Sequence, residues 1–171
     1  PLVHAGLVVY PFTQAQRVLR AWRDFIANAP MELSIWPVLR QAPPLPFLPE
    51  SIHGREVVVF AVRHAGELYK GERIASAVLG FGEPVGSMLV AQPYTAFQAA
   101  FDPLLAPGAR NYWKSHNFRE ITDDLIDALI DSATKLPGPE CEIFVAQLGG
   151  AAGQVPVADT AYAGRDANFV M

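Results

Sequence analysis

Residues 55–63 read REVVVFAVR, a valine-rich run that lies between two charged ends. Valine and phenylalanine favour an extended backbone, so this stretch predicts a buried strand. A predicted helix over 67–79, ended by Gly80, and a predicted strand over 83–91 come after it. The middle of the chain is therefore expected to form a strand, a helix and a second strand.

The same alternation precedes this stretch. Residues 4–10 predict another buried strand. Thr13 and Gln16 predict a capping box, and the apolar residues that follow recur at the spacing of an amphipathic helix. Residues 32–39 predict a strand, and the proline-rich residues 41–51 an extended connector. The order strand, helix, strand, strand, helix, strand is the split pattern of a ferredoxin-like α+β sandwich.

The second half of the chain adds further predicted elements. They are a helical turn over 95–101, a strand through 109–118, a helix over 123–135 that Thr122 caps, and a strand over 141–148. A short strand is expected at the C-terminal end. The predicted fold class is α+β: a ferredoxin-like split βαβ core extended to a mainly antiparallel sheet of about six or seven strands, with helices on one face. The other face then needs a cover.

Composition narrows the possible partners. Hydrophobic residues make up 51% of the chain and charged residues 18%, and the mean hydropathy is +0.18. No run approaches the roughly 18 apolar residues of a spanning helix, so we expect no membrane partner. The net charge of −4 argues against nucleic acid, whose binding proteins usually carry a basic stripe. The apolar excess instead predicts a surface that another protein segment covers.

The single cysteine and the two ends of the chain give expectations for the cellular location and the domain organisation of the protein. Cys141 has no partner for an internal disulfide and lies in an apolar stretch, which predicts a reduced, buried thiol. With no visible signal peptide, a cytoplasmic location is expected. Both ends fall in apolar runs. We therefore expect residues 1–171 to be a single domain taken from a longer polypeptide.

Residues 109–118, ARNYWKSHNF, combine aromatic and cationic side chains as the wall of a ligand site does. Alternation along the predicted strand places Tyr112, Lys114, His116 and Phe118 on one side. One interpretation is that this side binds a ligand. The alternative is that Tyr112 and Phe118 belong to the core, Lys114 reaches water and His116 makes a structural hydrogen bond.

Gln147 is a further candidate, because it lies at a strand end just before two glycines. It could contact a ligand or tie down the loop. The glycine-rich residues 149–153 lack dinucleotide-binding spacing, and the four histidines are scattered. No metal site is predicted, and no catalytic residue can be assigned.

Several of these stretches together resemble the substrate-binding domain of FAD-linked oxidases of the berberine bridge enzyme type, in the vanillyl-alcohol oxidase superfamily. The resemblance covers essentially the whole chain, in order. It is most specific in the run from ARNYWKSHNF to CEIFVAQLGG. Besides the proline-rich connector, the motifs are GLVVYPF, VLRAWRDF, ARNYWKSHNF, CEIFVAQLGGA and GRDANFVM.

The resemblance implies a parent flavoprotein that oxidises an alcohol or C–H group of a small organic substrate by hydride transfer to flavin. An N-terminal domain would bind the FAD, and a C-terminal segment would return to it; this chain contains neither, so it is expected to bind no cofactor and to be inactive alone. Tyr112, Lys114 and Gln147 carry over as pocket lining, and strand alternation adds His116.

Two other functions fit the residues. One is a free-standing ferredoxin-like module that dimerises sheet to sheet or binds a small ligand between the sheet and its partner. The other is a cofactor-free enzyme that uses His116 or Tyr112 as acid or base. The substrate cannot be identified from the sequence.

Overall fold

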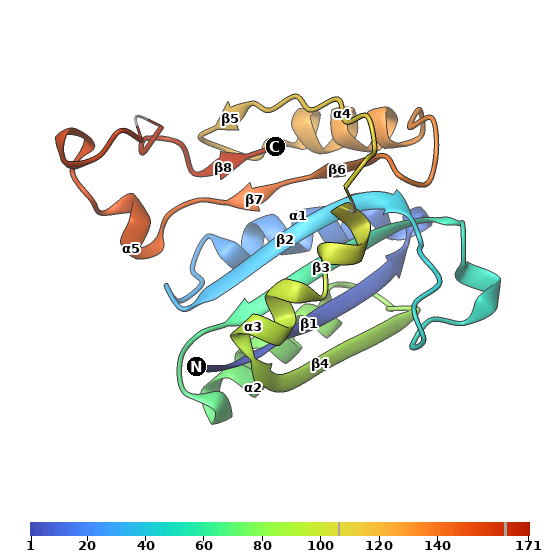
Figure 1. Ribbon diagram of the computed structural model, residues 1–171, viewed down its shortest axis with the longest axis horizontal. Coiled ribbons are helices and arrows are strands. Elements are labelled where there is room, and N and C mark those ends of the chain that lie inside the picture. Colours follow the sequence, from blue (N-terminus) through green and yellow to red (C-terminus); the bar gives the residue numbers. More distant parts are fainter. Residues whose placement is uncertain (106, 163) are drawn as a thin grey trace.

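The computed structural model describes residues 1–105, 107–162 and 164–171, without the side chains of residues 105 and 152. Five strands form one antiparallel sheet in the order β4-β1-β3-β2-β6 (Figure 1). The predicted α+β class and the ferredoxin-like order of the first four strands are confirmed. The strands are β1 Leu2–Pro11, β2 Leu33–Gln41, β3 Glu56–His64, β4 Gly86–Pro93 and β6 Glu142–Phe144.

β3, the strand predicted most clearly, lies at the centre of this sheet. It pairs with β1 from Val57 to His64 and with β2 along its whole length. Every residue from Val57 to Val62 is buried, because both faces of this strand are covered along most of its length. A run of consecutive β-branched residues therefore marks the central strand here.

Helices α1 (Ala15–Ile26), α2 (Leu68–Ser76) and α4 (Asp123–Ala133) contribute to the core on one face of the sheet. Trp22 of α1 is fully buried, and its indole Nε1 donates a hydrogen bond to the Ile35 carbonyl at 3.2 Å. Tyr10 and Phe60 lie in the same core with their ring centroids 5.8 Å apart. We call this the helix-covered face.

The two predicted helix caps differ in outcome. Thr122 caps α4, because its hydroxyl accepts a hydrogen bond from the Leu125 N–H at 3.2 Å. The capping box predicted at Thr13 and Gln16 is wrong. The chain first makes a 3₁₀ turn over Phe12–Gln14, so α1 begins later and no side chain caps it.

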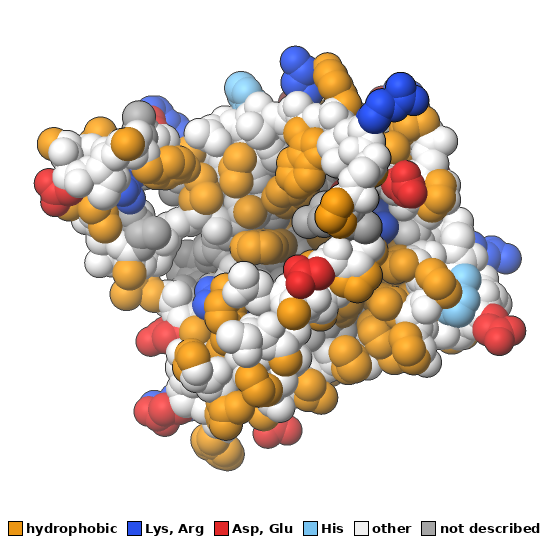
Figure 2. Space-filling model, in the orientation of Figure 1, with side chains coloured by type: hydrophobic (Ala, Val, Ile, Leu, Met, Phe, Trp, Pro, Cys, Tyr) orange, Lys and Arg blue, Asp and Glu red, His pale blue; other side chains and the backbone are white. Residues whose placement is uncertain are grey.

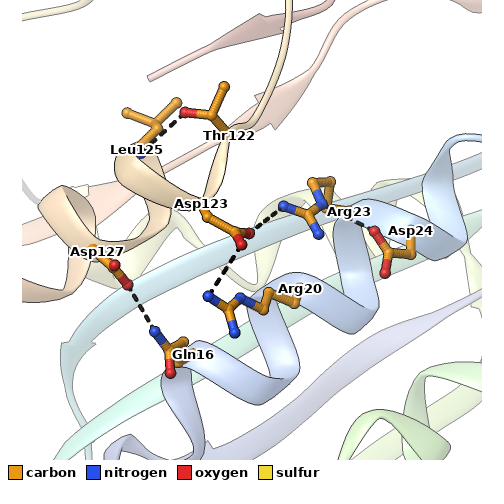
Figure 3. A network of polar contacts seen from close by, with 8 residues as sticks. All are labelled: Gln16, Arg20, Arg23, Asp24, Thr122, Asp123, Leu125 and Asp127. Carbon is orange, nitrogen blue, oxygen red and sulfur yellow. Dashed lines mark hydrogen bonds and ion pairs between the residues drawn. The ribbon is translucent and has the colours of Figure 1, made fainter.

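Polar contacts join α1 to α4 (Figure 3). Asp123, in the first turn of α4, accepts from Arg23 at 2.6 Å and pairs with Arg20 at 3.1 Å. Gln16 donates to Asp127 at 2.9 Å. The hydrogen bond from Arg23 lowers the pKa of the Asp123 carboxyl and raises the pKa of Arg23. These contacts bridge α1 and α4 at the protein surface.

A second, three-stranded sheet lies beside the first, in the order β5-β8-β7. The strand predicted over 141–148 is divided between the two sheets at Val145, whose N–H donates to the Pro37 carbonyl at 2.9 Å. The predicted strands are thus distributed over two sheets of five and three. The short strands are β5 Asn117–Phe118, β7 Ala146–Gln147 and β8 Phe169–Val170.

The strand predicted through residues 109–118 is wrong for most of its length. Residues 109–116 are irregular and exposed, and only β5 is extended and paired. Pairing begins where His116 exchanges backbone hydrogen bonds with Met171, at 2.9 and 3.1 Å. Before that point none of the described strands pairs with the segment, so alternation alone cannot make it extended.

Two short helices and the single cysteine are the remaining features of the fold. Helix α3 (Tyr94–Ala99) follows β4, and residues 150–153, expected in a loop, form the short helix α5 (Gly150–Gly153). Cys141 is free but half-buried, so the prediction of a buried thiol is wrong. Within the described residues, none of the helices has the length and apolar character needed to cross a membrane.

Candidate functional site

The face of the large sheet opposite α1 and α2 carries an apolar band that is exposed at Trp36 and Met88 and buried at Ala61. Strand register aligns Met88 with Leu7, Leu7 with Ala61, and Ala61 with Trp36, so the four side chains form one row across β4, β1, β3 and β2. Trp36 is 44% exposed and Met88 46%. We call this row the open row and this side of the sheet the open face.

Both ends of the open face have a cover within the chain. At one end, Leu48 of the proline-rich connector packs in a cluster with Val9 and Val59. At the other end, α3 packs against β1 and β4, and the Arg63 guanidinium lies 5.9 Å from the centre of the Tyr94 ring. The open row lies between these two covers.

Figure 2 shows this face. Hydrophobic side chains gather over β4 and beside the proline-rich connector. Val90, the next residue of β4 on the same face as Met88, is 44% exposed, and Leu104 beyond α3 is 49% exposed. Large apolar side chains are seldom left open in such a group unless something binds them.

The residues predicted from the sequence at 109–118 lie on an exposed segment. Tyr112 is 84% exposed, and the Lys114 ammonium lies 5.7 Å from the centre of its ring. His116 packs edge-on against Phe118, with ring centroids 4.9 Å apart. Tyr112 is therefore not a core residue, and the described residues around Tyr112 and His116 do not enclose an acid–base site. Tyr112, Lys114 and His116 therefore offer an aromatic ring, an ammonium group and an imidazole for contacts at the molecular surface.

The structure places Gln147 apart from the three other candidates. It lies in β7 directly opposite Phe169, whose ring packs edge-on against Trp22 of α1 at 5.9 Å. Paired residues of neighbouring strands point to the same side, so Gln147 faces the helices. There it lines an open hollow of about 510 Å³ together with Arg119 and Asn168.

Both guanidinium groups around that hollow are paired, whereas Glu120, which also lines it, makes no ion pair with a described residue. Arg119 donates to Asp166 at 2.6 Å, a hydrogen bond that lowers the pKa of the Asp166 carboxyl. Arg23, which also lines the hollow, is held by Asp24 and Asp123. Neither guanidinium is left without a counter-ion. Within the described part of the chain, no three His, Cys, Asp or Glu side chains lie close enough together to hold a metal ion.

No protein-family model matches this chain, and a search of curated proteins finds no match. Two solved oxidases share its fold. The 6-hydroxy-D-nicotine oxidase from Arthrobacter nicotinovorans superposes with a TM-score of 0.62 at 13% identity, over 89% of this chain and 34% of that chain. A chitooligosaccharide oxidase superposes with a TM-score of 0.62 at 14% identity, over 99% of this chain and 37% of that chain. This chain therefore spans about a third of the length of each.

The sequence alone did not predict the open row as a binding surface, although one feature of β2 pointed to it. Trp36 follows the buried Ile35, so β2 carries large apolar side chains on both faces. A strand buried on only one face usually alternates apolar with polar residues. The hollow gave no such signal, because Arg119 and Asp166 are 47 residues apart in the chain.

Proposed function

We propose that this chain is the substrate-binding domain of an FAD-linked oxidoreductase, and that a flavin domain of the same polypeptide covers its open face. The observation that carries the proposal is the open row, an apolar band with Trp36 and Met88 close to half exposed between two covered ends. The fold is shared with two oxidases of which the chain spans about a third, which supports a missing second domain.

The residues of the open face suit one part of FAD only. Trp36, Leu7 and Met88 offer an apolar wall of the kind that packs against a planar ring. A diphosphate needs backbone N–H groups or cations, and the chain has no glycine-rich phosphate-binding motif and a net charge of −4. The domain thus forms one wall of a shared pocket, and the other domain binds the cofactor.

In this proposal the chain positions the substrate and excludes water. Bound FAD would supply the electron acceptor for oxidation of an alcohol or C–H group by hydride transfer. Trp36 and Met88 keep water from the pocket, while Tyr112, Lys114 and His116 contact the polar end of the substrate from the exposed segment. Gln147 is not assigned to this pocket, because it faces α1.

The spectrum of the full-length polypeptide tests the proposal. Purified without added cofactor, it should show the visible absorbance of oxidised flavin, and a folded but colourless protein would contradict the proposal. Trp36→Glu should lower the flavin content or the turnover, because a charge would be buried in the domain interface. Tyr69→Glu is the matched control, since Tyr69 lies on α2 and is 84% exposed.

A second copy of the chain is the alternative occupant of the open row. The same half-exposed Trp36 and Met88 would be buried in a sheet-to-sheet dimer of a free-standing ligand-binding module. Sedimentation of the 171-residue chain separates the two functions. A well-defined dimer that Trp36→Glu dissociates favours the module, whereas a monomer favours the domain of a larger enzyme.

A further inference from the structure

Arg63 is a half-buried cation without a counter-ion on the open face. It lies on β3 two residues after Ala61 of the open row, so its side chain points to the same face. It makes no ion pair or hydrogen bond with any residue that the structure describes, and its guanidinium lies over the Tyr94 ring. Several other cations lack an ion pair with a described residue, but their side chains are exposed: Arg17, Arg55, Arg73, Arg110 and Lys114.

The guanidinium of Arg63 is open to a ligand. None of its nitrogens is a buried atom without a partner, so each can be reached from solvent. The Tyr94 ring, whose centre lies 5.9 Å away, covers one face of the guanidinium, while the N–H donors point outward in its plane. These donors form the fork that matches the two oxygens of a carboxylate.

Two side chains of β2 lie beside Arg63. Ser34 is aligned with Arg63 in the register of β2 and β3, so the two side chains are neighbours on the open face. The Ser34 hydroxyl also has no partner among the described residues and is not closed off from solvent. Trp36 is the next residue of β2 on this face and is 44% exposed. A ligand that meets all three side chains has an acid group at Arg63 and Ser34 and an apolar body against Trp36.

The charges of the open face show why an anion is needed when this face is covered. Arg40 and Glu142 are aligned at the connector end, and they form an ion pair with each other. Neither Glu32, in the turn before β2, nor Asp102, after α3, forms an ion pair with Arg63. A domain that covers the open face would remove water from Arg63, and a desolvated cation is costly unless an anion pairs with it.

We propose that Arg63 and Ser34 bind a carboxylate of the substrate, and that Trp36 packs against the apolar body of the same molecule. The inference rests on the proposed function and names its substrate class, an organic acid with an apolar body. The carboxylate is separate from the polar group that residues 112–116 contact. An acidic side chain of the flavin domain would satisfy Arg63 alone, whereas this ligand meets all three side chains. The diphosphate of FAD needs more donors than one guanidinium and one hydroxyl supply.

Benzoate and benzamide, which share a planar ring and differ in charge, test this proposal. The indole N–H signal of Trp36, assigned by its loss in Trp36→Phe, is followed by NMR in the full-length polypeptide during titration with each probe. Benzoate should shift this signal saturably and leave the signal of Trp22, fully buried on the helix-covered face, unchanged. Benzamide should bind roughly tenfold more weakly, because it offers Arg63 no negative charge.

The variant Arg63→Gln removes the charge and keeps a polar side chain. It should bind benzoate roughly tenfold more weakly than the unmodified protein does, and no better than it binds benzamide. Its flavin content should stay unchanged, because the flavin contacts proposed for this chain are apolar. Arg73→Gln is the matched control and should change neither affinity, since Arg73 is exposed on α2. If Arg63→Gln does not fold, the preference for benzoate over benzamide at the Trp36 signal decides instead.

Three results would overturn the proposal. The first is the absence of a saturable shift at Trp36 with benzoate. The second is an equal affinity for benzoate and benzamide, or a preference that survives in Arg63→Gln. The third is a loss of flavin from Arg63→Gln, which would show that Arg63 pairs with the flavin domain or with FAD. Any of these results in a flavin-loaded parent protein contradicts this inference alone, whereas a colourless parent protein contradicts the proposed function.

Discussion

The two faces of the large sheet are formed by the same strands but differ in how far their large apolar side chains are buried. On the helix-covered face Tyr10 and Phe60 are fully buried beneath α1, together with Trp22. On the open face Trp36 and Met88, also large and apolar, stay close to half exposed. The chain's own helices cover one face, whereas the proline-rich connector and α3 cover the other face mainly at its two ends. Part of the apolar excess of the sequence therefore lies on this exposed surface and not in the core.

The two tryptophans should show the largest difference in stability. Trp22→Ala removes a fully buried ring and its hydrogen bond to Ile35, and should lower the free energy of unfolding by about 3–5 kcal/mol. Trp36→Ala should cost about 1 kcal/mol or less, because that ring is 44% exposed. Urea denaturation of the two variants measures both. Equal losses would show that the open face is already packed within this chain.

Tyr10 should make the helix-covered face sensitive to alkali. Burial raises the pKa of its phenol from 10.0 to about 12, and the hydroxyl donates to the Val78 carbonyl. The unfolded chain ionises first, so stability is fully present below pH 10.0 and falls as pH rises to about 12. The loss should be on the order of 1–3 kcal/mol.

Chemical denaturation at several pH values measures this loss. Tyr10→Phe should be less stable at neutral pH, yet its stability should fall less between pH 10 and about 12 than that of the unmodified protein. If both proteins lose the same stability over that range, another group causes the alkaline transition.

The caps of the covering helices should have a smaller effect. Thr122→Ala removes the hydroxyl that accepts from Leu125 N–H, and should cost about 1 kcal/mol. Thr13→Ala is the matched control and should cost close to nothing, because Thr13 is exposed and caps no helix. Thermal unfolding compares the two variants. A larger loss of stability for Thr13→Ala than for Thr122→Ala would indicate that Thr13 does cap α1, against the structure.

The ion pairs between α1 and α4 should have the smallest effect. Hydrogen bonding from Arg23 lowers the pKa of Asp123 below 3.8, so the pair stabilises the fold above that pH and is lost as pH falls through the lowered value. Because Asp123 is exposed, solvent weakens the contribution. In Asp123→Asn the free energy of unfolding should fall slightly less at acid pH than in the unmodified protein. An unchanged pH dependence would show that the ion pair does not contribute to stability.

The core of the fold could be predicted from the sequence because local signals agreed with the final pairing. Residues 57–62 are apolar and mostly β-branched, and the apolar spacing after residue 13 matches α1. The prediction of a strand over 109–116 failed because β8, which lies far along the chain, is two residues long and pairs with this part of the chain only at β5. Aromatic composition does not by itself supply the neighbouring strand that an extended segment needs.

The candidate sites were harder to predict than the fold. The sequence identified Tyr112, Lys114, His116 and Gln147 as special but could not tell that Gln147 faces α1. That direction depends on the break between β6 and β7 at Val145, where the chain passes from one sheet to the other. A shift of one residue at such a break reverses every later side chain.

Hydroxyl-radical footprinting of the monomeric full-length polypeptide tests directly whether a flavin domain covers the open face. Oxidation of Trp36 and Met88 is followed by mass spectrometry, with Tyr69 as the exposed internal reference. We predict that Trp36 and Met88 react far more slowly than their exposed fractions of 44% and 46% in this chain would allow, while Tyr69 reacts freely. Rapid oxidation of Trp36 and Met88 in a flavin-loaded monomer would show that no domain covers the open face.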